Sequence, residues 1–242
     1  MSRLGFNYRD RVRSVMPEAL YGYWPLDSRD GSTTMLDWSR QANHGTAAAV
    51  TLNHGRSAVE RKCPLFDGST SYIDVYSSAL NTDFGASVGT AMAWFRCLDA
   101  GVYGDSTKRR ILTIGAHATT NVIILEKTVT ANTFDLTYVA NSTTDKVSPT
   151  IYDPGTYDTK WHQLVLGWDI TTNNKVYGYV DGELSSTSST LGTWSGALLS
   201  TACVIGSSAT TAADVWSGWI SDVALWSKLL TADDVKYLYA RA

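Results

Sequence analysis

Charged residues are scarce in this 242-residue chain, at 18% against about 25% in an average globular protein. The 20 basic and 23 acidic residues give a formal charge of −3, so no excess of positive charge favours nucleic acid as a partner. Apolar runs are short, and none approaches the ~20 residues that a membrane-spanning helix needs. The composition therefore predicts neither a nucleic-acid-binding nor a membrane-spanning protein.

Cysteine occurs only three times, at Cys63, Cys97 and Cys203. An odd number of widely separated cysteines argues against a disulfide framework and against a zinc site, whose ligands are closely spaced. We expect three reduced, mostly buried thiols, with one long-range disulfide as the alternative. The first 13 residues carry five charges and leave no room for the apolar core of a secretory signal. We therefore expect assembly in a cytoplasm without an N-terminal export signal.

Glutamate occurs only four times, at Glu18, Glu60, Glu126 and Glu183. Glycoside cleavage needs two positioned carboxylates, and no two of these residues are close in sequence. The four histidines form no zinc motif, and the chain has neither a phosphate loop nor a nucleophile elbow. We therefore predict that the protein is not an enzyme, although two aspartates in an unusual arrangement could still form a catalytic pair.

Hydroxyl and aromatic residues are abundant instead, with 25 Ser, 29 Thr, 13 Tyr and 9 Trp. Thr, Tyr and Trp favour strands, and short apolar or alternating runs separated by turn residues predict an all-β sandwich or barrel. The expected strands are 20–26, 47–52, 63–66, 72–75, 91–98, 110–115, 121–127, 133–140, 146–151, 161–169, 175–180, 184–187, 202–206 and 218–226. One all-β domain of this size is ordinary, so we predict a single sandwich at residues 19–242.

Turn residues specify two hairpins and several loops. In the first hairpin, residues 170–174 (ITTNN) join the strands 161–169 and 175–180. Asp181 and Gly182 follow the alternating strand 175–180 and favour a tight turn with positive φ. Three stretches are polar but carry little charge, which suggests exposed loop tips: 140–145, 185–190 and 207–213.

The C-terminus carries the signals of a short helix. Thr231 is a good N-cap and Asp234 occupies the third helical position, as in a capping box. Val235, Leu238 and Tyr239 form an apolar stripe. We predict a helix that packs on the sandwich.

Residues 1–18 form a basic arm, whose four arginines outweigh Asp10 and Glu18 to give a net charge of +2. A frayed terminus is the simple interpretation, but apolar residues among the charges suggest an arm that docks on a partner or on a neighbouring copy. Deleting the arm is then expected to leave the sandwich folded. The candidate partner-binding residues are Phe6, Tyr8, Arg9, Arg11 and Arg13.

Motifs in a consistent order resemble those of laminin-G-like domains over residues 20–239. They are LYGYWPLD at 20–27, LDWS at 36–39, NHG at 43–45, FDGSTSYIDV at 66–75, AMAWFR at 91–96, WHQLVLGWD at 161–169, VYGYVDGE at 176–183 and GWISDVALW at 218–226. The resemblance implies a concanavalin A-like jelly roll, in which two antiparallel sheets pack face to face, with the N-terminal arm and the short C-terminal helix attached. Such folds host binding, adhesion, glycoside cleavage and structural roles, so the fold leaves function open.

The resemblance also implies a candidate calcium site, because some relatives bind Ca²⁺ at one rim of the sandwich through aspartates and backbone carbonyls, the hard oxygen ligands this ion prefers. The matching positions here are Asp27, Asp30, Asp37 and Asp222. The alternative is that Asp27 and Asp37 cap turns and that Asp222 pairs locally. No other cofactor is expected.

Tryptophan rings pack well against sugars, which makes exposed tryptophans candidates for a glycan site. Trp24, Trp94, Trp161 and Trp168 lie in core-like strands and are expected to be buried. Four others lie nearer to loops: Trp38, Trp194, Trp216 and Trp219. Of these we select Trp38, Trp194 and Trp216 as candidate sugar-binding residues.

Three functions compete. The first is a non-enzymatic protein of a phage or other virus particle, a head decoration or tail component. Its arm would dock on virion proteins or copies of itself, without contacting nucleic acid or membrane. This hypothesis explains a surface-type fold without export signal or paired cysteines, because a virion leaves the host by lysis.

The alternative is a carbohydrate-binding adhesion module for surface glycans. The third is a polysaccharide-cleaving enzyme, against which the missing Glu-x-Asp-x-Glu strand of related glucanases argues.

Overall fold

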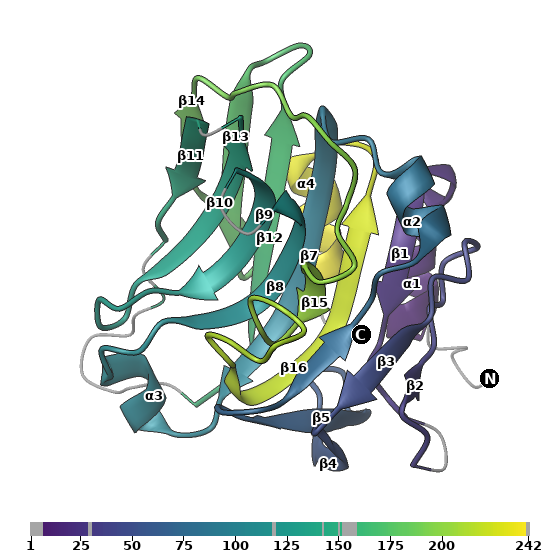
Figure 1. Cartoon of the computed structure of the whole chain (residues 1–242), viewed down its shortest axis with the longest axis vertical. Coiled ribbons are helices and arrows are strands. Elements are labelled where there is room, and N and C mark those ends of the chain that lie inside the picture. Colours follow the sequence, from purple (N-terminus) through teal and green to yellow (C-terminus); the bar gives the residue numbers. More distant parts are fainter. Residues whose placement is uncertain are drawn as a thin grey trace, which may run out of the picture.

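Two antiparallel sheets pack face to face in the computed structural model, which describes residues 7–28, 31–117, 120–141, 143–149, 151 and 159–240 (Figure 1). The first sheet has the order β14 (Glu183–Ser189), β13 (Lys175–Val180), β12 (His162–Asp169), β7 (Val88–Cys97), β16 (Ser217–Trp226), β5 (Lys62–Asp67) and β4 (Thr51–Arg56), with β1 (Leu20–Trp24) also paired to β16. The second sheet has the order β11 (Thr143–Val147), β10 (Phe134–Ala140), β9 (Asn121–Lys127), β8 (Arg109–His117), β15 (Cys203–Ile205), β6 (Tyr72–Asp74), β3 (Gly45–Ala48) and β2 (Thr34–Met35). The predicted two-sheet sandwich is confirmed.

The main core lies between the sheets and consists of side chains that alternate inward along the strands. It includes large rings with almost no exposure, among them Trp24, Phe66, Phe95, Phe134, Trp168 and Trp216. The three cysteines are free and buried, as predicted, and burial raises the pKa of each thiol to about 12. The main core is therefore apolar, and all three thiols are protonated at neutral pH.

Two predicted loop tips are wrong, because 143–145 lies in β11 and 185–189 lies in β14, the edge strands of the two sheets. Their Ser and Thr side chains suit a strand that is largely exposed. The expected strand 47–52 is also wrong, since Ala49 has φ of 53° and separates β3 from β4. Here the chain leaves the second sheet and enters the first.

Local turn and cap signals were accurate. Asp181 and Gly182 both have positive φ, 50° and 83°, as the predicted hairpin turn requires. Helix α4 (Ala232–Tyr239) begins with the predicted capping box between Thr231 and Asp234. Two short helices that were not predicted follow the N-caps Ser77 and Asp99: α2 (Ser78–Asp83) and α3 (Ala100–Gly104). No helix in the described part of the chain is long and apolar enough to cross a membrane.

A second core lies on the outer face of the first sheet, where α4 and the N-terminal segment cover it. This segment consists of α1 (Tyr8–Ser14) and the 3₁₀ turn η1 (Pro17–Ala19), and α1 lies beside β1 (Figure 1). Its apolar residues pack against Trp94 and Trp226, and they are Tyr8, Val12, Val15 and Ala19. Residues 7–19 are thus packed on the sandwich as a layer of its fold.

Candidate functional site

A shallow pocket of about 200 Å³ lies between the N-terminal segment and the loop that follows β2. Its lining combines one aromatic ring with charged, hydroxyl and aliphatic side chains: Asp10, Arg13, Ser14, Pro17, Leu20, Trp38, Ser39 and Arg40. We name it the Trp38 pocket. An aromatic face beside polar groups can hold a small molecule that has one apolar face and several hydroxyls.

Helix α1 supplies one wall of the pocket. Asp10, Arg13 and Ser14 are three and four residues apart, so they lie on one side of the helix. The opposite side carries Tyr8 and Val12, which are buried. Sequence reasoning missed Asp10 and Ser14 because the segment was interpreted as an arm, although this amphipathic spacing was the available signal.

The loop after β2 supplies the other wall and is organised by Asp37. This carboxylate, 7% exposed, accepts hydrogen bonds from the backbone N–H groups of Tyr23, Ser39 and Asn43, each at 2.8 Å. The N–H of Trp38 donates to the carbonyl of Tyr23 at 2.7 Å. Trp38 is therefore held against β1 by its own backbone N–H and by the carboxylate of the preceding residue, Asp37.

Arg9 places a guanidinium over the Trp38 ring, 4.0 Å from its centroid. The same guanidinium pairs with Asp27, and Nε of Arg61 lies 3.7 Å from the Asp27 carboxylate. Arg61 also pairs with Asp222. A chain of alternating charges beneath α1 thus holds Arg9 in place, and Arg9 in turn fixes the orientation of the indole.

Burial determines the protonation of the inner end of this network. Asp222 is fully buried, and burial raises its pKa although Arg61 and the Tyr23 hydroxyl, which donates to it at 2.6 Å, act in the opposite direction. Burial and the nearby Asp222 carboxylate raise the pKa of Tyr23 well above its ordinary value. Burial lowers the pKa of Arg61, but Asp222 and Tyr23 outweigh it and leave the pKa above its ordinary value. Tyr23 is therefore neutral and Arg61 charged at neutral pH.

Residues 67–236 match the model of a laminin-G-type family described as the concanavalin A-like lectin/glucanases superfamily. The chain belongs to this family. The predicted resemblance to laminin-G-like domains is thereby confirmed, whereas a phage or virus origin stays a prediction. The family description covers both lectins and glucanases, so membership leaves the choice between binding and cleavage open.

Solved structures similar to this laminin-G-type domain include parts of botulinum neurotoxins. The serotype D binding domain has a TM-score of 0.68 and 14% identity, covering 93% of this chain and 52% of that chain. The serotype D ligand binding domain in complex with N-acetylneuraminic acid has a TM-score of 0.65 and 12% identity, covering 95% and 52%. The binding domain of neurotoxin DC in complex with rat synaptotagmin II has a TM-score of 0.67 and 12% identity, covering 93% and 52%. The chain spans about half the length of these structures, and such low identity shows a shared fold alone. No curated protein matches the sequence.

Among the described residues, the predicted calcium ligands Asp27, Asp37 and Asp222 already have other partners and are not gathered into a metal site. Asp27 and Asp222 lie on either side of the Arg61 guanidinium, and Asp37 is bound by backbone amides. Within the described residues no group of three His, Cys, Asp or Glu side chains is placed to hold a metal ion. Asp30 lies outside the described residues. Of the alternative interpretation, turn capping by Asp37 agrees with these contacts, whereas Asp27 pairs with Arg9 and Asp222 pairs with the distant Arg61.

The three candidate sugar-binding tryptophans are not brought together. Trp216 is fully buried, with its ring edge-on to Phe95 at 5.3 Å, so its assignment as a sugar-binding residue is wrong. Trp194 is half-buried against Phe84 and Tyr138, with ring centroids 5.6 and 6.0 Å away. Only Trp38 of the three lines the Trp38 pocket.

Of the predicted partner-binding residues, some are buried in the fold and one lines the Trp38 pocket. Tyr8 is buried and its hydroxyl accepts from the Trp94 indole N–H at 2.7 Å. Arg11 is also buried and donates to the carbonyl of Tyr237 at 3.1 Å. Arg13 is exposed and lines the Trp38 pocket. Phe6 lies outside the described residues.

Proposed function

We propose that this domain is a carbohydrate-binding adhesion module that holds one sugar residue in the Trp38 pocket and does not cleave it. The observation that carries the proposal is the fixed indole of Trp38 beside the polar side chains of α1 and the loop. A pyranose ring presents C–H groups on one face and hydroxyls at its edge, which complement an aromatic ring bordered by Ser14 and Ser39. Because Arg9 already orders the indole, binding costs little side-chain entropy.

The charge of the pocket supports an acidic sugar as its ligand. Arg13 and Arg40 outweigh Asp10, so the lining has a net charge of +1. Arg40 pairs with Glu18, but both side chains are largely exposed and such pairs are weak. A guanidinium can bind a carboxylate with two parallel hydrogen bonds. The related neurotoxin domain solved with N-acetylneuraminic acid supports this choice by analogy of fold.

Replacing Trp38 or Arg13 is expected to weaken binding of acidic glycans. Trp38→Ala removes the stacking surface and is expected to lower affinity about tenfold, or about 1.4 kcal/mol. Trp38→Phe keeps an aromatic face and should retain most of the affinity. Glycan arrays followed by calorimetric titration would measure these effects, with circular dichroism to confirm folding.

Arg13→Ala is the second arm of this experiment, because an exposed helical arginine can be changed without loss of the fold. Arg56→Ala is its matched control, since Arg56 is an exposed arginine outside the Trp38 pocket. An unchanged affinity in both Trp38→Ala and Arg13→Ala would contradict the site. No binding of any glycan by the native protein would contradict the function.

Display on a virus particle is a second proposal. The three free, buried thiols support it, because they suit a protein that assembles in a reducing cytoplasm. Purified particles are expected to contain this chain in constant proportion to a shell or tail protein by quantitative mass spectrometry. A chain found only in the particle-free fraction of the lysate would contradict this role.

A further inference from the structure

A groove lies where loops meet the outer face of the second sheet. It consists of two adjoining cavities of about 500 and 340 Å³ that share Lys108 and Val129 in their linings. Seven Ser and Thr side chains contribute hydroxyls to it, and none of the lining residues is aromatic. We name it the loop groove. Its size and hydroxyl-rich surface suit a longer polar ligand than the Trp38 pocket can hold.

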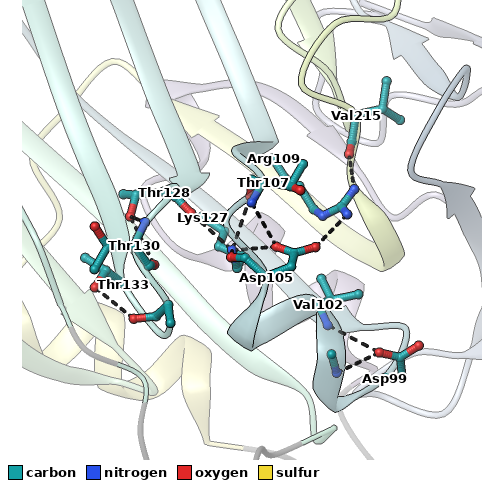
Figure 2. Close-up of polar contacts among 12 residues, drawn as sticks. Asp99, Val102, Asp105, Thr107, Arg109, Lys127, Thr128, Thr130, Thr133 and Val215 are labelled. Atoms are coloured by element: carbon teal, nitrogen blue, oxygen red, sulfur yellow. Dashed lines mark hydrogen bonds and ion pairs between the residues drawn. The ribbon is translucent and has the colours of Figure 1, made fainter.

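One buried amine holds the loops at the edge of the groove (Figure 2). Lys127 is fully buried, and its Nζ donates to the Asp105 carbonyl at 2.7 Å and carboxylate at 2.9 Å. It also donates to the carbonyls of Thr107 and Thr128, both at 3.1 Å. Arg109 binds the other carboxylate oxygen of Asp105 at 2.8 Å and the Val215 carbonyl at 3.3 Å. These contacts connect three loops and make the groove rigid before a ligand arrives.

Strand register places charges in a row across the sheet. Arg110 on β8 lies opposite Glu126 on β9, which lies opposite Asp135 on β10. Adjacent strands are ~4.8 Å apart, a spacing comparable to the length of one sugar ring. Nζ of Lys146 lies 2.8 Å from Asp135, and Nζ of Lys108 lies 3.2 Å from Asp214. The row therefore runs from one donor, Arg110, to two neighbouring acceptors, Glu126 and Asp135, with Lys146 as a donor beside the second, at a spacing comparable to consecutive sugar units.

The lining charges of the groove cancel. The basic residues are Lys108, Arg109 and Lys146, and the acidic residues are Glu126, Asp135 and Asp214. A sulfated or carboxylated ligand would bring its charge next to three carboxylates. A neutral ligand whose hydroxyls both donate and accept can bind each ion pair without disrupting it.

The Arg110–Glu126 pair retains unused hydrogen-bonding capacity. Its atoms Nε and Oε2 are 2.6 Å apart, and the side chains are only 9% and 12% exposed. Within the described residues, Nη1 of Arg110 and Oε2 of Glu126 make no hydrogen bond of good geometry. Burial lowers the pKa of Arg110 and raises the pKa of Glu126, in agreement with an incompletely solvated pair. Oε2 of Glu126 is itself buried, so a ligand meets this pair through the part of the Glu126 side chain that lines the groove.

We propose that the loop groove binds a neutral oligosaccharide of two or more sugar units, whose hydroxyls contact the paired charges of β8, β9 and β10. The inference rests on the proposed carbohydrate-binding function, but it involves different residues and a different class of glycan from the Trp38 pocket. Glu126 and Asp135 are the neighbouring carboxylates that a glycoside hydrolase would need. Each is ion-paired with a cation, which favours binding over proton transfer.

Titration with neutral oligosaccharides tests the groove, using the native protein and variants of its more exposed lysines. Lys108→Ala and Lys146→Ala change side chains that are 38% and 52% exposed, so folding should survive. Each is expected to weaken binding of neutral oligosaccharides about fivefold, as the loss of one ordinary hydrogen bond predicts. Lys236→Ala is the matched control, because Lys236 forms an exposed ion pair with Glu183 and lies outside the groove.

Trp38→Ala separates the two sites, because it should weaken binding of acidic glycans and leave binding of neutral oligosaccharides unchanged. Lys108→Ala should weaken binding of neutral oligosaccharides and leave binding of acidic glycans unchanged. Failure of the native protein to bind any neutral oligosaccharide would overturn the groove while leaving the Trp38 pocket intact. A loss of affinity for neutral oligosaccharides in Lys236→Ala as large as that in Lys108→Ala would also overturn the groove. Release of new reducing ends from a bound oligosaccharide would overturn the assignment of Glu126 and Asp135 to binding alone.

Discussion

Deletion of residues 1–18 is expected to destabilise the protein severely, in contrast to the expectation for a free arm. The deletion removes Tyr8, Val12 and Val15 from the second core, and burial of each such side chain contributes roughly 2 kcal/mol. It also removes the carbonyl of Val15, which accepts from the Trp226 indole N–H at 2.9 Å. The combined loss is comparable to the total stability of about 5–15 kcal/mol of an ordinary domain.

Thermal unfolding followed by circular dichroism, together with limited proteolysis, would measure this effect. Deletion of residues 1–6 is the matched control, because it leaves the described contacts of Tyr8, Val12 and Val15 in place. Tyr8→Phe is a milder variant that removes only the hydroxyl bound to the Trp94 indole, at a cost of about 1 kcal/mol. An unchanged unfolding temperature after deletion of residues 1–18 would show that the helix does not stabilise the sandwich.

This prediction changes how particle incorporation should be tested. A truncated chain that fails to join a particle could simply be unfolded. Arg13→Ala leaves the apolar side of α1 intact, so it separates loss of a partner contact from loss of the fold. A particle that incorporates Arg13→Ala normally would exclude this residue as its attachment point.

Replacement of Lys127 by alanine is expected to reduce the free energy of unfolding by about 3–5 kcal/mol, as for other broken buried ion pairs. The variant removes one of the two cations that bind the Asp105 carboxylate, leaving Arg109, and the carbonyls of Thr107 and Thr128 lose their donor. Lys127→Met keeps most of the side-chain volume without the charge and should also be destabilised. Urea unfolding at neutral pH would measure these losses. Lys236→Ala, at an exposed pair, should stay within about 0.5 kcal/mol of the native protein.

The pH dependence of this loss identifies its origin. Burial raises the pKa of Asp105, but hydrogen bonds from Lys127 and Arg109 outweigh it and lower the pKa below its ordinary value. A lowered carboxyl pKa gives stability that is present above the unfolded-state pKa of about 3.9 and is lost as pH falls through the folded-state pKa. The difference between native protein and Lys127→Ala should therefore shrink in acid. A constant difference down to low pH would show that lost packing, not lost charge, causes the effect.

Local patterns predicted most strands and failed where a pattern is ambiguous. The alternation in 175–180, the turn at Asp181 and Gly182, and the capping box of α4 all follow from contacts within a few residues. The expected strands 146–151 and 184–187 located β11 and β14 only in part, because Ser and Thr occupy exposed edge strands as readily as loops. α1 was missed because seven residues rich in arginine resemble an unstructured tail.

The candidate sites depended on contacts that no local pattern contains. Trp38 was selected correctly as a residue near the surface, but Trp216 was not, since the segment between β15 and β16 gives no sign of which way its ring points. Glu126 and Asp135 are neighbours only because β9 and β10 pair in that register.

The sequence by itself determined the all-β class, the family, the free cysteines and the caps and turns, because these depend on composition and on spacing within short segments. Only the tertiary structure decided that the basic segment covers a second core, and that Arg9 orders Trp38 through Asp27. The physical reason is burial: the partner of a desolvated charge is chosen by packing between distant segments. Arg61 and Asp222 are 161 residues apart in the chain and form one ion pair in the fold.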